Sequence, residues 1–376
     1  MGKLQKGQRN SNLELLRIFA MVLIIAHHFA FHGFNNVDFV VSNSNNYIIY
    51  FLTVFGKVGV DLFIILSAYF MVNSKFTFKK FLIVGGEVYF YSILFLVLFS
   101  YVLTPIKPIS GESWFSSILP ISQSAYWFIT DYLVLMLFSP FLNKFIHNIS
   151  KKNYLNVLGI SLILWCIYPT FLGGSCFDFN SIIWFIILYL IGGFIRLHVD
   201  IEKITNKGLA LLTIIAGIVC YGTYAGSATL ALVRHSDKWA DFSKLLYGQN
   251  SVFILIVAIA VFLIFLKRKE FSNKFINYIA GSVLGVYLIH ENMFFRPYLW
   301  KGILKLSAHY NSHHFLLFAI GSIILVFIFA TLADIVRRLT VEKVWIHILD
   351  WKLEGVISFF NRIFNACFEK LNNYFS

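Results

Sequence analysis

The chain has 376 residues, of which 59% are hydrophobic and 13% are charged, and its mean hydropathy is +0.75. An average soluble domain is about one quarter charged, so this composition excludes an ordinary soluble globular protein. A formal net charge of +13 would suggest a nucleic-acid partner for a soluble chain. In a membrane protein the positions of the cations matter more than their sum, and we expect no nucleic-acid partner.

Apolar runs of roughly 20 residues recur from end to end, and each can cross a hydrocarbon layer about 30 Å thick. Such continuous runs favour helices over a transmembrane β-barrel, whose strands alternate apolar and polar residues. The sequence therefore predicts an all-α, polytopic membrane helical bundle of about ten transmembrane helices. The expected spans are 13–33, 48–72, 80–104, 125–146, 154–172, 181–197, 208–226, 250–266, 276–295 and 314–337.

Lysine and arginine gather in alternate connecting segments. The rich segments are the N-terminus, the loops near 75–80, 144–152, 196–207 and 267–274, and the chain after 337. Because cytoplasmic loops carry an excess of positive charge, this pattern predicts a multi-pass protein of the cell membrane with both termini in the cytoplasm. Apolar residues at helical spacing among the cations predict a C-terminal amphipathic interfacial helix. We therefore divide the chain into a transmembrane domain, 1–340, and a cytoplasmic amphipathic tail, 341–376.

The first predicted helix carries the densest set of ionisable side chains. Such groups are costly inside a membrane unless they face the bundle interior, so they are functional candidates. His28 lies eleven residues after Arg17, which is close to three turns and about 16 Å along the axis, so the two share a face with Glu14. His27 should point elsewhere. A structural alternative is Arg17 paired with Glu14, and His28 bonded to a neighbouring helix.

Other polar side chains interrupt the later spans. Lys57 and Asp61 stand one turn apart in the second predicted helix and could neutralise each other. Trp127 lies with other aromatic residues at the outer end of the fourth predicted helix, where either an interfacial belt or a substrate platform fits. The remaining candidates are Glu87 in the third predicted helix, Asp131 in the fourth, and His290, Glu291 and Arg296 at the outer end of the ninth.

Several of these residues lie in segments that resemble the membrane acyltransferase-3 family. The resemblance rests on Arg17 and His28 with ten residues between them, and on the run Gly-Val-Asp-Leu-Phe-Ile-Ile-Leu-Ser-Ala-Tyr-Phe over 59–70. Segments similar to family segments in the fourth and ninth helices support it. These are Tyr-Trp-Phe-Ile-Thr-Asp-Tyr over 126–132, Ser-Pro-Phe-Leu-Asn over 139–143 and Leu-Gly-Val-Tyr-Leu-Ile-His over 284–290.

The resemblance implies an O-acetyltransferase that uses cytoplasmic acetyl-CoA, without a metal, to acylate a hydroxyl of a cell-envelope or exported polysaccharide. Histidine can accept the hydroxyl proton or the acyl group itself, and both roles stay open for His28. Asp61 either orients His28 or pairs with Lys57. The expected residues are His28, Arg17 and Asp61 for catalysis, Arg17, Lys75, Lys79 and Lys80 for coenzyme A phosphates, and Trp127, Asp131, His290 and Glu291 for the acceptor.

The lysines near the third helix and the class of the protein each have a second interpretation. The lysines near the third helix also fit ordinary positive-inside bias. A transporter or flippase of a lipid-linked glycan would also place charges within a bundle. The sequence shows neither the internal repeats nor the matched helix interruptions that such folds often carry, which favours the enzyme. The expected partners are acyl-CoA, a glycan or lipid-linked sugar acceptor and the lipid bilayer, and a homo-oligomer is left open.

Overall fold

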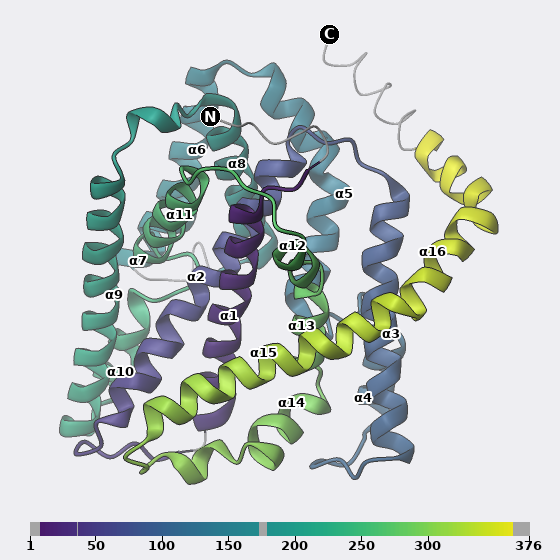
Figure 1. Cartoon of the computed structure of the whole chain (residues 1–376). Coiled ribbons are helices and arrows are strands. Elements are labelled where there is room, and N and C mark those ends of the chain that lie inside the picture. The colour runs from purple at the N-terminus through teal and green to yellow at the C-terminus, as the bar shows by residue number, and fades with distance from the viewer. Residues whose placement is uncertain (1–7, 36, 173–178, 364–376) are drawn as a thin grey trace.

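The computed structural model describes residues 8–35, 37–172 and 179–363, and every regular element in these ranges is a helix (Figure 1). The predicted all-α class is therefore confirmed. Within these ranges, eight helices or helical runs are long and apolar enough to cross a membrane. They are α1 (Ser11–Phe34), α2 (Asn45–Met71), α3 (Phe78–Tyr101), α5 (Trp127–Asn148), α6–α7 (Lys151–Phe171), α8 (Ser181–His198), α9 (Asn206–Arg234) and α15–α16 (Phe315–Trp351).

Short polar side chains mark where many of these helices begin. A Ser, Thr or Asn at the N-cap accepts a hydrogen bond from a backbone N–H of the first turn, which otherwise lacks a partner. The residues that cap helices in this way are Asn10, Ser110, Ser150, Asn180, Thr205, Ser251 and Asn273. The shorter helices are α4 (Gly111–Ile118), α10 (Asp237–Leu245), α11 (Val252–Leu266), α12 (Lys274–Ala280), α13 (Val283–His290) and α14 (Phe295–Pro297).

Two of the predicted spans do not form one continuous helix that is long enough to cross a membrane. The eighth corresponds to α11, whose 15 residues cover about 22 Å at 1.5 Å per residue, less than the hydrocarbon thickness. The ninth is interrupted between α12 and α13, at Gly281 and Ser282. The Arg338 guanidinium satisfies polar groups at this break, because it donates to the Tyr278 carbonyl at 2.9 Å and to Ser282 Oγ at 3.0 Å. The interruption was not expected from the sequence, and the count of ten spans stays a prediction.

α1 and α2 pack closely through two glycines of α2. A Cβ added at Gly56 would lie 1.9 Å from Cβ of His27, and one added at Gly59 would lie 2.4 Å from the carbonyl oxygen of Ala20. Only glycine permits this approach of the two backbones, as is common between membrane helices. The contact places α1 in the interior of the bundle, where its ionisable side chains meet other helices rather than lipid.

The C-terminal part of the chain crosses the front of the bundle in Figure 1, where α15 runs on towards α16 (Val341–Trp351). Thr340 separates the two helices, so the predicted division after residue 340 falls at a helix boundary. Trp345 donates from Nε1 to the Leu82 carbonyl at 3.2 Å, and Asp350 pairs with Lys79, so α16 rests on α3. Its interfacial position stays a prediction. Part of the cation-rich N-terminus, residues 1–7, and the end of the predicted tail helix, residues 364–376, lie outside the described residues.

Candidate active site

The start of α1 forms one wall of an arginine-rich cavity of about 540 Å³. The Glu14 carboxylate lies between two cations, Arg9 at 2.7 Å and Arg17 in a short ion pair. Arg196 of α8 also lines the cavity and donates to the Tyr69 hydroxyl at 2.7 Å. Three arginines therefore line one space, together with the acidic side chains of Glu14 and Glu270. Guanidinium is well suited to bind phosphate groups in a bidentate manner.

The predicted lysines do not join this arginine-rich cavity. Lys75 and Lys80 line a separate cavity of about 320 Å³ beside α5, whereas Lys79 pairs with Asp350. Arg9 and Arg196 instead accompany Arg17. Both lie in cation-rich segments of the chain, the N-terminus and the loop 196–207, but nothing in the sequence indicates that they lie beside Arg17. Helix packing decides this, since Arg196 comes from the end of α8.

The C-terminal half of α1 contributes to a cluster of histidine and carboxylate side chains. His28 Nδ1 lies 2.9 Å from His290 Nε2 and 3.2 Å from Glu291 Oε2. His32 Nε2 lies 3.3 Å from the same carboxylate oxygen, and Arg296 donates to Glu291 Oε1 at 2.6 Å. The structure thus brings together His28, His290 and Glu291, which the sequence predicted as site residues on two separate helices. His32 was not among the predicted site residues, although its spacing of four from His28 was a usable signal.

Hydrogen bonds fix which nitrogen of each ring carries the proton. His290 Nδ1 lies 2.6 Å from the Val286 carbonyl oxygen, which can only accept, so Nδ1 carries hydrogen and a neutral His290 presents a lone pair at Nε2. That lone pair faces His28 Nδ1, which therefore donates. The neutral His28 ring then carries its one in-plane lone pair on Nε2. Nε2 is therefore the ring atom that can accept a proton, and the side chain of His28 is 12% exposed.

His27 faces away from this cluster, as the helical periodicity predicts. Its Nδ1 donates to the Thr53 carbonyl of α2 at 2.8 Å, and Gly56 packs against its Cβ. The Arg17–Glu14 ion pair, the structural alternative raised from the sequence, is also present. Pairing with Glu14 does not remove Arg17 from the cavity, since both side chains line it.

Asp61 is fully buried and makes its hydrogen bonds away from α1. Its Oδ1 accepts from Trp184 Nε1 at 3.0 Å and from Gln249 Nε2 at 2.8 Å. The ammonium of Lys57 lies over the Tyr247 ring, 4.3 Å from the centroid. The carboxylate beside His28 is thus Glu291, and a catalytic role for Asp61 stays a prediction.

The predicted acceptor residues on α5 lie near the same region. Tyr126, directly before α5, is buried and accepts at its hydroxyl from Asn292 Nδ2 at 2.7 Å, so the start of α5 is held against the chain that follows Glu291. Trp127 is 40% exposed and Asp131 lies one turn further along the helix. Their contact with an acceptor stays a prediction.

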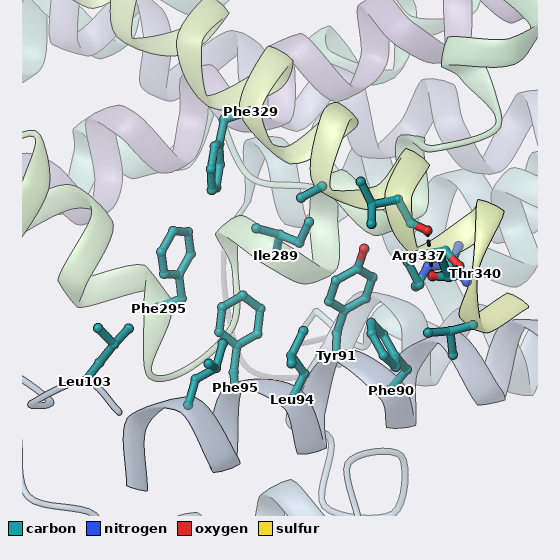
Figure 2. Close-up of a pocket in the computed structure, with 14 residues that line it drawn as sticks. Phe90, Tyr91, Leu94, Phe95, Leu103, Ile289, Phe295, Phe329, Arg337 and Thr340 are labelled. Atoms are coloured by element: carbon teal, nitrogen blue, oxygen red, sulfur yellow. Dashed lines mark hydrogen bonds between the residues drawn. The ribbon is translucent and has the colours of Figure 1, made fainter. Parts of the chain in front are cut away.

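An apolar cavity of about 230 Å³ borders the cluster, with His290 as its one polar side chain. A second cavity of about 410 Å³ lies between α3 and α15, and Ile289, Phe295 and Phe329 line both (Figure 2). In the second cavity the Arg337 guanidinium donates to Asp334 Oδ1 at 2.7 Å. The smaller cavity, which His290 lines, therefore offers apolar space beside the histidine cluster.

A comparison with known protein families identifies the family of this chain. The model of the acyltransferase domain matches residues 10–333, which include α1, the histidine cluster and all residues lining the arginine-rich cavity except Gln8 and Arg9. The chain belongs to the acyltransferase-3 family of integral membrane acyltransferases. No curated protein and no solved structure matches the chain.

Proposed function

We propose that the protein is an O-acetyltransferase of the cell membrane that moves an acetyl group from cytoplasmic acetyl-CoA to a hydroxyl of a cell-envelope or exported polysaccharide. The single observation that carries this proposal is the arrangement along α1. Arginines at its start suit the phosphates of coenzyme A, and His28, about 16 Å further along the axis, has a free lone pair for proton transfer. Both termini are then cytoplasmic, and the histidine cluster is nearer the outer face.

The chemistry follows from the protonation state of His28. The acceptor hydroxyl gives its proton to His28 Nε2 as its oxygen attacks the thioester carbonyl. The carbon–sulfur bond then breaks, and the coenzyme A sulfur leaves with the proton held on Nε2. The Nδ1 proton stays between His290 and Glu291, whose negative charge stabilises the imidazolium that forms during transfer. An acyl-histidine intermediate would use the same lone pair as nucleophile, and ping-pong kinetics would distinguish that route.

The donor half of the proposal is tested by binding. Calorimetry with the purified protein should show acetyl-CoA binding that coenzyme A displaces. Arg17→Ala should weaken it by about tenfold or more, because one charge-assisted contact to phosphate is worth about 1.5–3 kcal/mol. Lys75→Ala is the matched control, since Lys75 lines a different cavity. Absence of binding by folded protein would contradict the proposal and favour a glycan transporter.

The chemical half is tested by transfer of labelled acetyl groups to envelope polysaccharide. His28→Ala should lower the rate by about 10²–10⁴-fold, the usual contribution of a general base. His27→Ala is the control, because His27 bonds to α2 and lies outside the cluster. Full activity of a folded His28→Ala protein would exclude His28 as base or nucleophile.

A further inference from the structure

Three side chains of metal-binding type converge at the outer end of α1. One ligand atom from each of His28, His32 and Glu291 lies within 4.8 Å of the other two. His28 and His32 are four residues apart, so both rings project from the same face of the helix. Glu291 approaches from the end of α13. Two imidazoles and one carboxylate are a common three-ligand set for zinc.

Two of the three separations between the ligand atoms match those expected around a tetrahedral ion, and the third, between the two histidine nitrogens, is within 4.8 Å. Glu291 Oε2 lies 3.2 Å from His28 Nδ1 and 3.3 Å from His32 Nε2. Zinc bonds of about 2.0–2.1 Å at tetrahedral angles place neighbouring ligand atoms about 3.4 Å apart. A charge-assisted hydrogen bond would be shorter, at about 2.7–2.9 Å.

The carboxylate oxygen is also poorly satisfied without an ion. Glu291 Oε2 is buried and has no hydrogen-bond partner of acceptable geometry within the described part of the chain, although two imidazole nitrogens lie close to it. Arg296 holds the other oxygen, Oε1, at 2.6 Å. A carboxylate oriented in this way by an outer hydrogen bond is typical of metal sites.

We infer that His28 Nδ1, His32 Nε2 and Glu291 Oε2 form a Zn²⁺ site, and that the bound ion inhibits acyl transfer. The inhibition rests on the proposed function, whereas the ion binding does not. Without zinc, His28 carries its proton on Nδ1 and its lone pair on Nε2. Zinc on Nδ1 requires the other neutral tautomer, with the same single proton moved to Nε2. The nitrogen that accepts the hydroxyl proton then has no lone pair.

Binding of Zn²⁺ alone tests the site. Competition with a chromophoric chelator, on purified full-length protein stripped of metals, should give one zinc per chain. His32→Ala and His32→Gln should each weaken the affinity by about tenfold or more. His313→Ala is the matched control, because His313 is exposed and outside the cluster. Equal zinc affinity of the wild type and both folded His32 variants, or no stoichiometric binding, would overturn the inference.

Inhibition is measured separately, as the transfer rate with zinc divided by the rate without it for each protein. Wild-type transfer should stop at saturating zinc and return after chelation, and the His32 variants should need about tenfold more zinc. Stoichiometric binding with no loss of transfer would overturn the inhibitory half only. Absence of any His28-dependent transfer would instead count against the proposed function and leave the binding result standing.

Discussion

Replacement of Glu291 by Gln tests how the cluster sets the reactive nitrogen of His28. Arg296 donates to Oε1, so the glutamine oxygen should take that position and the amide NH₂ should take the position of Oε2. That NH₂ group would face His28 Nδ1, at a separation near the present 3.2 Å. A donor there favours the tautomer with a lone pair on Nδ1 and the proton on Nε2.

The expected cost is large because the wrong tautomer cannot accept a proton from the hydroxyl. A charge-assisted interaction is worth about 1.5–3 kcal/mol, so its loss alone lowers the rate by about 10–150-fold. If all His28 rings adopt the other tautomer, the loss in rate approaches the roughly 10⁴-fold loss that follows replacement of the aspartate of a Ser-His-Asp triad by asparagine. We expect kcat to fall by about 10²–10⁴-fold.

The assay distinguishes a change in the tautomer of His28 from a general disruption of the protein. Initial rates of acetyl transfer at varied acetyl-CoA should show the loss in kcat, with the KM for acetyl-CoA changed by less than about threefold if substrate binding is rapid. The arginine-rich cavity lies at the opposite end of α1, so its donor contacts are intact. Glu354→Gln is the control, since this side chain is exposed on the tail. A folded Glu291→Gln protein with wild-type kcat would refute the tautomer argument.

Three further predictions concern stability. Gly56→Ala should lower the free energy of unfolding by about 1–3 kcal/mol, because the added Cβ would lie 1.9 Å from Cβ of His27 in α1. Gly222→Ala is the control, because its added Cβ meets open space, and it should leave the thermal midpoint unchanged or higher. Trp184→Phe removes one of two donors to the buried Asp61 carboxylate and should cost about 1–3 kcal/mol in a denaturant titration; an unchanged midpoint would show that the indole hydrogen bond contributes nothing. Asp350→Asn breaks a largely exposed ion pair between α16 and α3 and should cost less than about 1 kcal/mol, so a larger fall in the thermal midpoint would contradict the exposed geometry.

Some properties of the site were readable from the sequence because they depend on one helix alone. The different directions of His27 and His28 follow from a rotation of about 100° per residue, and His27 does bond to Thr53 of α2. The Arg17–Glu14 pair follows from a separation of three. The interruption of the ninth predicted span was missed, because the polar groups near Gly281 are satisfied by Arg338 from α15.

The class of protein and the positions of most helices follow from the amino-acid sequence alone, because the length of an apolar run and the position of a capping side chain are local properties. Which polar groups contact one another depends on how the helices pack. His28 and His290 are 262 residues apart in the chain and 2.9 Å apart in space. Asp61, in the neighbouring helix, instead bonds to Trp184 and Gln249. The rotation and close approach of packed helices determine such pairings, and neither is encoded in the spacing along any one helix.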